Sequence, residues 1–165
     1  MSSLDKTRGA QTVAPSTEAS SHATRRILVV EDDKIIRQLS ATWLASSGYQ
    51  VAAAENGAAG WEALHANDFD LLITDHAMPK LTGLELVKKV RSAHMTLPVI
   101  LATGVLPEAE LERHPWLQLS ATLLKPYSPQ QLLQTVQSVL HATAPEPFPR
   151  PTAPFQQLLP GFHLR

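Results

Sequence analysis

Residues 70–79 have the sequence Asp-Leu-Leu-Ile-Thr-Asp-His-Ala-Met-Pro. The apolar run at residues 71–74 is typical of a buried strand, and the carboxylate Asp75 follows where that strand ends. Ligands of open α/β sheets bind at the carboxyl ends of the strands. Asp75 is therefore a candidate functional carboxylate, and its partners have to come from the ends of other strands.

Three other predicted strands also end on polar residues. Glu31 and Asp32 follow the first strand, Thr103 follows the fourth, and Lys125 follows the fifth. The first strand, Ile-Leu-Val-Val, is a continuous apolar run of the kind expected of a central parallel strand that is covered on both faces. The expected strands are residues 27–30, 49–53, 71–74, 98–102 and 122–124.

Segments with helical spacing separate these strands. On the first helix, Ile36, Leu39 and Trp43 fall on one apolar face. Pro115 is expected to stop the fourth helix and to leave residues 114–120 irregular. Strands that alternate with helices imply a parallel sheet with right-handed crossovers and helices on both faces. The expected helices are residues 33–47, 56–66, 82–93, a short one from residue 107, and 128–141.

In such a sheet the strand ends lie along one edge, which brings together Glu31, Asp32, Asp75, Thr103 and Lys125. The three carboxylates would repel one another unless a cation lay between them, and an all-oxygen ligand set favours Mg²⁺ over zinc. A hydroxyl and an ammonium group opposite a metal-bound carboxylate form a pocket for a tetrahedral anion. Attack by the carboxylate on phosphorus would give an acyl phosphate.

The composition narrows the class of protein. The chain has 165 residues, 44% of them hydrophobic, a net charge of −1 and no cysteine. These values suit one domain, give no basic excess for nucleic-acid binding, and exclude disulfides and thiolate metal sites. Since the sequence contains neither a membrane-spanning run nor a secretory signal, we expect a soluble cytoplasmic protein.

Residues 1–24 are expected to be a disordered leader, and residues 142–165 a proline-rich tail that is extended or disordered.

Four motifs occur in a recognisable order: Ile-Leu-Val-Val-Glu-Asp-Asp at residues 27–33, Asp-His-Ala-Met-Pro at 75–79, then Thr103, then Lys125-Pro126. With these motifs, residues 25–141 resemble the receiver domain of response regulators in two-component signalling. The resemblance implies a flavodoxin-like, doubly wound, five-stranded parallel sheet of strand order 2-1-3-4-5. It also implies a stand-alone receiver, because the residues that follow 141 are too few and too proline-rich for a DNA-binding module.

The resemblance assigns a role to each residue at the edge. Asp75 matches the phosphoacceptor, which takes phosphate from a histidine kinase or a histidine phosphotransfer protein. Thr103 matches the switch hydroxyl that moves toward the phosphoryl group, and Lys125 matches the lysine that pairs with a phosphoryl oxygen. A cis peptide bond is expected between Lys125 and Pro126.

The resemblance also implies a Mg²⁺ site. Asp32 matches an acidic ligand of the metal, and Glu31 matches a neighbour that acts through metal-bound water. Asp75 itself is a ligand, and Ala77 occupies the position that offers a backbone carbonyl.

Two positions depart from the pattern of receivers. Thr122 stands three residues before the lysine, where an aromatic residue coupled to the switch hydroxyl is common. Pro115 breaks the fourth helix, and the surface formed by that helix, the fifth strand and the fifth helix is where receivers commonly dimerise or meet partners. The relay from Asp75 to the surface is therefore expected to differ from the usual one.

Three functions remain open at this stage. The first is a phosphoryl-accepting switch that is not an enzyme beyond its own phosphorylation and slow dephosphorylation, with output through a downstream protein, a homodimer or a role as phosphate shuttle or sink. The second is a phosphatase of the haloacid-dehalogenase type, although that family normally has a second acid where this chain has Ala77. The third is a binding module that keeps the fold without using phosphate. Neither nucleic acid nor a membrane is expected as a partner.

Overall fold

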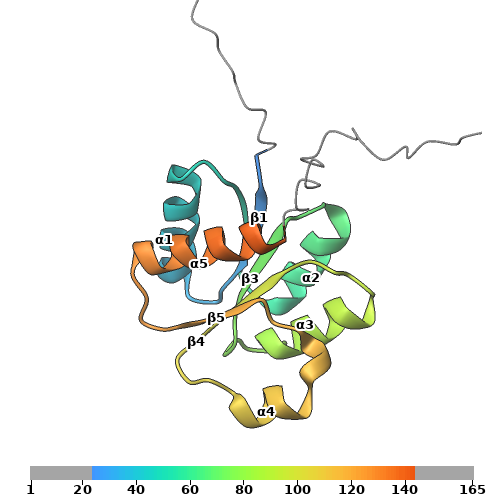
Figure 1. Ribbon diagram of the computed structural model, residues 1–165. Helices are drawn as coiled ribbons and strands as arrows, with labels where there is room; N and C mark the ends of the chain where they lie inside the picture. Colours follow the sequence, from blue (N-terminus) through green and yellow to red (C-terminus); the bar gives the residue numbers. More distant parts are fainter. Residues whose placement is uncertain (1–23, 144–165) are drawn as a thin grey trace, which may run out of the picture.

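The computed structural model describes residues 24–143, which form a parallel sheet between two layers of helices (Figure 1). Within this range the sheet has five strands in the order β2-β1-β3-β4-β5. Both the fold class and the strand order predicted from the sequence are confirmed. The strands are β1 (Arg26–Val30), β2 (Gln50–Ala54), β3 (Leu71–Asp75), β4 (Val99–Thr103) and β5 (Ala121–Leu124).

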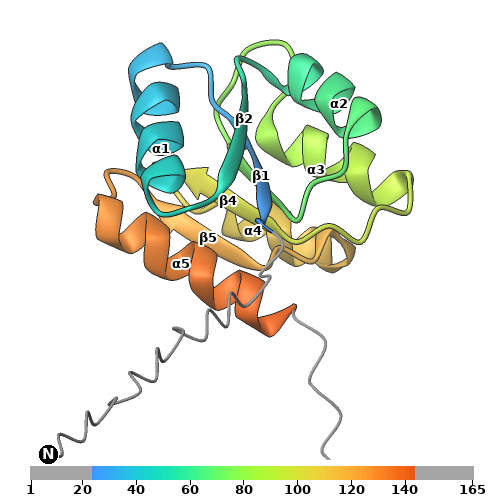
Figure 2. The same ribbon diagram turned by 90° about the horizontal axis from the view of Figure 1, so that it is seen from above.

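Helices cover both faces of the sheet. Figure 2 shows α1 and α5 side by side on one face, with α2 and α3 on the other. The connection between β4 and β5 holds the short α4 and one turn of 3₁₀ helix. The helices are α1 (Lys34–Ser46), α2 (Gly57–Ala66), α3 (Gly83–Ser92), α4 (Glu108–Arg113), η1 (Pro115–Leu117) and α5 (Pro129–Ala142).

Side-chain caps begin the longer helices. Asp33 accepts hydrogen bonds from the backbone N–H groups of Ile35 and Ile36 at the start of α1. Ser128 and Gln131 form a capping box at the start of α5, where a proline occupies the first turn. Caps of this kind satisfy backbone donors that have no partner inside the helix. They place the first turns of α1 and α5 directly after the strand ends that carry the candidate site.

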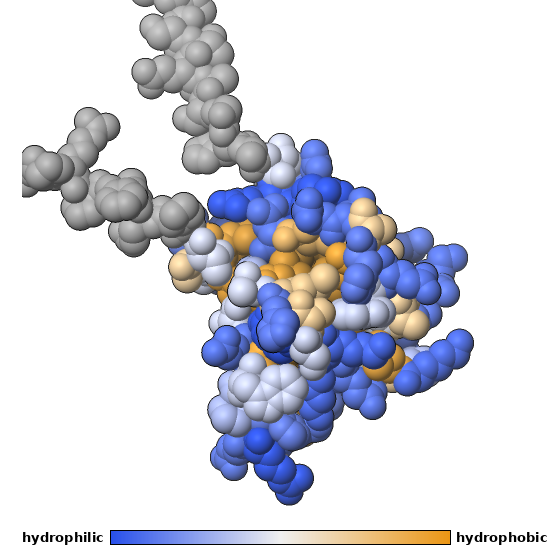
Figure 3. Space-filling model, turned by 90° about the vertical axis from the view of Figure 1, so that its right-hand side faces the viewer, coloured by the Kyte–Doolittle hydropathy of each residue, from blue (hydrophilic) through white to orange (hydrophobic). Residues whose placement is uncertain are grey.

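The two faces of the sheet carry separate hydrophobic cores because side chains alternate along each strand. On the face of α1 and α5, Ile27, Val29 and Ile73 pack against helix residues that include Leu44 and Leu132. The opposite core, against α2 and α3, is built from Leu28, Val30, Leu72, Leu86, Val90 and their neighbours. Figure 3 shows the side of the molecule that lies to the right in Figure 1, where hydrophilic side chains surround a central group of hydrophobic ones.

The strand register aligns the carboxyl ends of the strands. Val30 pairs with Thr74 across β1 and β3, Asp75 pairs with Ala102 across β3 and β4, and Thr103 pairs with Leu124. The residues that follow β1, β3 and β5 therefore emerge at one edge. This alignment is the structural basis of the candidate site.

Ile36, Leu39 and Trp43 share one face of α1, as expected, and line one groove. Leu39 on this face is 44% exposed, while Ser40 and Leu44 of the same helix are buried. Helical spacing defines an apolar stripe but not which edge of the stripe the neighbouring elements cover. One local prediction was wrong. Residues 114–120 were expected to be irregular, but Pro115–Leu117 form the η1 turn, in which Leu117 is buried in the core.

The predicted leader (1–24) lies outside the described residues except for Thr24, and the predicted tail (142–165) lies outside them except for Ala142 and Thr143. No helix within residues 24–143 combines the length and the hydrophobicity that a membrane crossing requires. The predicted cis bond between Lys125 and Pro126 is present.

Asp70, the residue before β3, bonds to residues at the start of β1. Its carboxylate accepts a 2.7 Å hydrogen bond from the backbone N–H of Arg26 and forms a 2.8 Å ion pair with Arg25. Partial burial acts to raise the pKa of Asp70, but these hydrogen bonds and the two arginine charges outweigh it and lower the pKa below its ordinary value of 3.8. The charged form of Asp70 is therefore the form that stabilises the fold.

We predict that Asp70→Asn lowers the free energy of unfolding by about 1 kcal/mol at neutral pH, because it weakens a charge-assisted hydrogen bond at a half-exposed position. Because the folded pKa is lowered, this contribution is complete above pH 3.8 and is lost as the pH falls through the folded pKa. Urea unfolding of both proteins at several pH values measures the difference. Asp68→Asn is the control, since Asp68 is exposed and has no hydrogen-bond partner within residues 24–143. A difference that grows on acidification would contradict the assignment.

Candidate functional site

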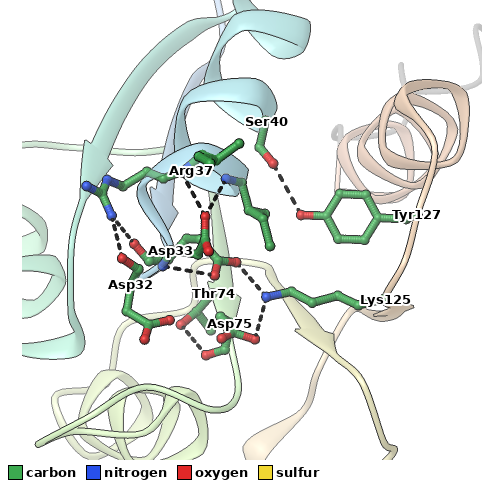
Figure 4. A network of polar contacts seen from close by, with 11 residues as sticks. Asp32, Asp33, Arg37, Ser40, Thr74, Asp75, Lys125 and Tyr127 are labelled. Atoms are coloured by element: carbon green, nitrogen blue, oxygen red, sulfur yellow. Dashed lines mark hydrogen bonds and ion pairs between the residues drawn. The ribbon is translucent and has the colours of Figure 1, made fainter.

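Four of the predicted site residues converge at the carboxyl edge of the sheet (Figure 4). Glu31 and Asp32 follow β1, Asp75 is the last residue of β3, and Lys125 follows β5. Glu31 and Asp75 are buried, with 3% and 6% of their surface exposed, whereas Asp32 is exposed. The site is thus a largely buried carboxylate pair with one carboxylate open to solvent.

Lys125 joins the two buried carboxylates. Its Nζ lies 2.7 Å from Oε2 of Glu31 and 2.9 Å from Oδ1 of Asp75. Burial raises the pKa of Glu31 and the charge of Asp75 adds to this, while the hydrogen bond from Lys125 opposes it. Burial acts to lower the pKa of Lys125, but its pairing with Glu31 and Asp75 raises it overall. The lysine is therefore held as a cation in the middle of the site.

The three carboxylates suit a hard divalent cation. One oxygen each from Glu31, Asp32 and Asp75 lies within 4.8 Å of the other two. Ala77, the remaining predicted ligand, is exposed in the loop after β3, and its carbonyl accepts no hydrogen bond within residues 24–143. Oxygen ligands of this kind are preferred by Mg²⁺ and Ca²⁺. A single ammonium group leaves two of the three carboxylate charges unbalanced, so the electrostatics also favour a bound cation.

Thr103 reaches the same edge, but its hydroxyl is not directed at the carboxylates. Its Oγ1 donates a 2.7 Å hydrogen bond to the carbonyl of Val105 and accepts one from the Val105 N–H. The Val105 side chain is 78% exposed. The predicted switch residue is therefore in place, and its hydroxyl is held within its own loop.

Sequence reasoning missed two residues that shape the site. The guanidinium of Arg37, on α1, donates hydrogen bonds to the backbone carbonyls of Glu31 and Asp32, and so holds the acidic loop against the helix (Figure 4). Gly83, the first residue of α3, lies so close to Asp75 that a Cβ would collide with the Asp75 carbonyl. The contact of Arg37 with the acidic loop is local in sequence, six residues from Glu31, and could have been anticipated. The contact of Gly83 with Asp75 joins β3 to α3 and becomes visible only in the folded chain.

His76 is the immediate chain neighbour of Asp75. The side chain is half-buried, and its Nδ1 is buried without a hydrogen-bond partner among the described residues. The residue follows β3 directly, and its backbone N–H and carbonyl bond to Ala102 and Gly83.

Residues 27–137 match the family model described as the response regulator receiver domain. The chain belongs to this family. A curated relative, chemotaxis protein CheY1 of Helicobacter pylori, is 38% identical over 119 residues, which cover 70% of this chain and 96% of the relative. Response regulator MprA of Mycobacterium sp. (strain KMS) is 32% identical over 126 residues, and the match covers 75% of this chain but only 54% of MprA.

Solved structures agree with this assignment. The chain resembles CheY4 of Vibrio cholerae with a TM-score of 0.67 and 31% identity, over 71% of this chain and 99% of that one. It also resembles response regulator TrrA of Thermotoga maritima in complex with Mg²⁺ and BeF, with a TM-score of 0.63 and 28% identity, over 70% and 99%. The protein is therefore a CheY-like receiver of two-component signalling, from a family of signalling switches that bind Mg²⁺ through acidic residues.

We predict that Gly83→Ala lowers the free energy of unfolding by about 1–3 kcal/mol, because the new methyl group forces the Asp75 backbone and α3 apart. Intrinsic helix propensity alone would favour alanine at this position, so the sign of the change isolates the steric effect. Denaturant unfolding measures it. Gly104→Ala is the control, since a Cβ at Gly104 meets no atom within 4 Å. Equal stability of the two variants would contradict the proposed role of Gly83.

Proposed function

We propose that the protein is a phosphoryl-accepting signalling switch in which Asp75 takes phosphate from a histidine kinase or a histidine phosphotransfer protein. The observation that carries the proposal is the position of Lys125, whose ammonium group lies between the carboxylates of Asp75 and Glu31. A nucleophilic carboxylate beside a fixed cation is the arrangement that phosphoryl transfer to aspartate requires. The switch occupies residues 25–141.

In the proposed transfer step, side chains of this protein act as the nucleophile and hold the charge of the phosphoryl group. An oxygen of Asp75 attacks phosphorus, the new O–P bond forms as the N–P bond of phosphohistidine breaks, and the released imidazole takes up a proton. Lys125 exchanges its contact with Asp75 for one with a phosphoryl oxygen, while Glu31 continues to hold the ammonium group in place. Glu31, Asp32, Asp75 and the Ala77 carbonyl would hold Mg²⁺, which neutralises charge on the transferring group when it is bound.

Thr103 is the proposed switch. To reach a phosphoryl oxygen on Asp75, its hydroxyl must release the Val105 carbonyl and rotate, which frees that loop to move. In receivers, an aromatic side chain at the position of Thr122 commonly moves into the space that the switch hydroxyl leaves. The Thr122 side chain is too small to fill that space. The consequence of phosphorylation is therefore expected mainly in the loop from Thr103 to α4.

Output follows from protein contact or from the use of the protein as a phosphate shuttle or sink. Water attack on the aspartyl phosphate gives slow self-dephosphorylation, which resets the switch. The site offers no second acid at Ala77 to accelerate hydrolysis in the manner of an aspartate-dependent phosphatase.

We predict that acetyl phosphate with Mg²⁺ adds the mass of one phosphoryl group to the intact protein, and that Asp75→Asn abolishes the addition. Omission of Mg²⁺ is expected to suppress it as well. Intact-protein mass spectrometry provides the measurement, and circular dichroism verifies that the variant is folded.

Asp68→Asn serves as the matched control for this experiment, because Asp68 is an exposed acid outside the site. It should be phosphorylated like the unaltered protein. Phosphorylation that survives in Asp75→Asn, or its absence from the unaltered protein, would contradict the proposal.

Metal binding is tested separately from phosphorylation. We predict that Asp32→Asn weakens Mg²⁺ binding by about tenfold or more, equivalent to about 1.4 kcal/mol, because it removes the one solvent-exposed carboxylate of the cluster. Isothermal titration calorimetry with MgCl₂ measures the affinity, and Asp33→Asn is the comparison, since Asp33 caps α1 and is not part of the cluster. Equal loss of affinity in both variants would argue for a diffuse charge effect in place of a defined site.

A further inference from the structure

An apolar groove next to the site is not used by the proposed phosphoryl chemistry. It lies between α1 and the loop from β5 to α5 and encloses about 390 Å³. We call it the α1 groove and define it by its lining residues: Ile36, Leu39, Trp43, Lys125, Pro126 and Tyr127. Lys125 is the only charged residue of this lining. An apolar, aromatic lining of this kind is typical of a binding surface.

The walls of the groove are held in place. The Tyr127 hydroxyl lies 3.2 Å from Oγ of the buried Ser40 on α1, and this hydrogen bond joins the loop to the helix. Figure 4 shows the two side chains pointing toward each other. Trp43 is half-buried against the core of this face, and Leu39 remains 44% exposed at the rim. The groove is thus a preformed concave surface. A ligand that covered the exposed Leu39 would bury apolar surface, which favours binding.

The chain itself contains a segment of matching chemistry. Residues 145–155 have the sequence Pro-Glu-Pro-Phe-Pro-Arg-Pro-Thr-Ala-Pro-Phe. Prolines at alternate positions favour the extended polyproline II conformation, which loses little entropy on binding. Grooves lined by aromatic side chains recognise such segments through their prolines and neighbouring apolar residues. Phe148 adds an aromatic side chain in the middle of this run.

The chain that follows α5 is long enough to return to the groove. The groove lies at the start of α5, since Pro126 and Tyr127 directly precede that helix. α5 has 14 residues and therefore carries the chain about 21 Å away from the groove. A polyproline segment that runs back from Thr143 covers about 22 Å in seven residues. Because α1 and α5 lie side by side (Figure 2), such a path brings Phe148, Pro149 and Pro151 to the groove.

We propose that the α1 groove binds the chain's own segment 145–155 in an intramolecular contact. The contact covers Leu39 and Trp43 with the Phe148 side chain and its flanking prolines. Since Lys125 lines the groove and also pairs with Asp75, the bound segment would contact a residue of the candidate phosphorylation site. The proposal does not depend on phosphorylation and is tested without it.

The absence of cysteine from the chain allows a direct test on the full-length protein. A nitroxide spin label attached at Thr152→Cys should broaden the backbone amide signals of nearby residues in the ¹⁵N-labelled protein. We expect the signals of Ile36, Leu39 and Tyr127 to lose more than half of their intensity relative to the reduced label. Signals from α2 and α3, on the opposite face of the sheet, should keep theirs.

A pair of substitutions on α1 provides the control. Leu39→Lys should abolish the broadening, because it places a charge in the groove at an exposed position that tolerates it. Ile35→Lys changes an even more exposed residue of the same helix, 69% exposed and outside the groove, and should leave the broadening intact. Equal effects of the two variants would overturn the proposal.

Two further outcomes would also overturn it. Broadening that is uniform, or that centres on α2, α3 or α4, would mean that the segment does not occupy the groove. Broadening in a mixture of unlabelled ¹⁵N protein with spin-labelled ¹⁴N protein, equal to that within one chain, would assign the groove to the segment of a second copy.

Discussion

The interaction on which the site depends is the ion pairing of one ammonium group with two buried carboxylates. Lys125 lies within 3 Å of both Glu31 and Asp75, which come from different strands and would otherwise repel each other in a poorly solvated position. Removal of one partner from such a buried set leaves an uncompensated charge, which is costly. The pairing therefore offsets the repulsion between the two carboxylates and holds in position the groups that the proposed phosphoryl transfer would use.

The parallel sheet brings the charged side chains of the site together. Hydrogen bonds from the loops after the strands determine which helices are joined to the site. Arg37 holds the acidic loop to α1, and the Ser40–Tyr127 hydrogen bond holds the loop after β5 to the same helix. On the other side, the Thr103 hydroxyl bonds to Val105 in its own loop, and the short α4 follows. The described hydrogen bonds thus tie the loops of the site to α1, whereas the loop that holds Thr103 leads to α4.

Most of the fold and the core of the site could be predicted from the sequence. Continuous apolar runs ending on polar residues located Glu31, Asp32, Asp75 and Lys125, because parallel topology places all strand ends on one edge. The direction of the Thr103 hydroxyl could not be predicted, since a side-chain torsion depends on the nearest available acceptor. Gly83 and the exposure of Leu39 could not be predicted either, because both depend on which neighbouring element covers a position in the folded chain.

The central claim, that Asp75 is the nucleophile, is tested most directly by locating the phosphoryl group on the chain. Treatment with acetyl phosphate and Mg²⁺ followed by borohydride reduction converts an aspartyl phosphate to homoserine, which tandem mass spectrometry of peptides assigns to a single position. Homoserine is expected at position 75 and at no other acid. Homoserine at position 32 or 33, or a phosphoryl group that resists reduction and maps to His76, would contradict it.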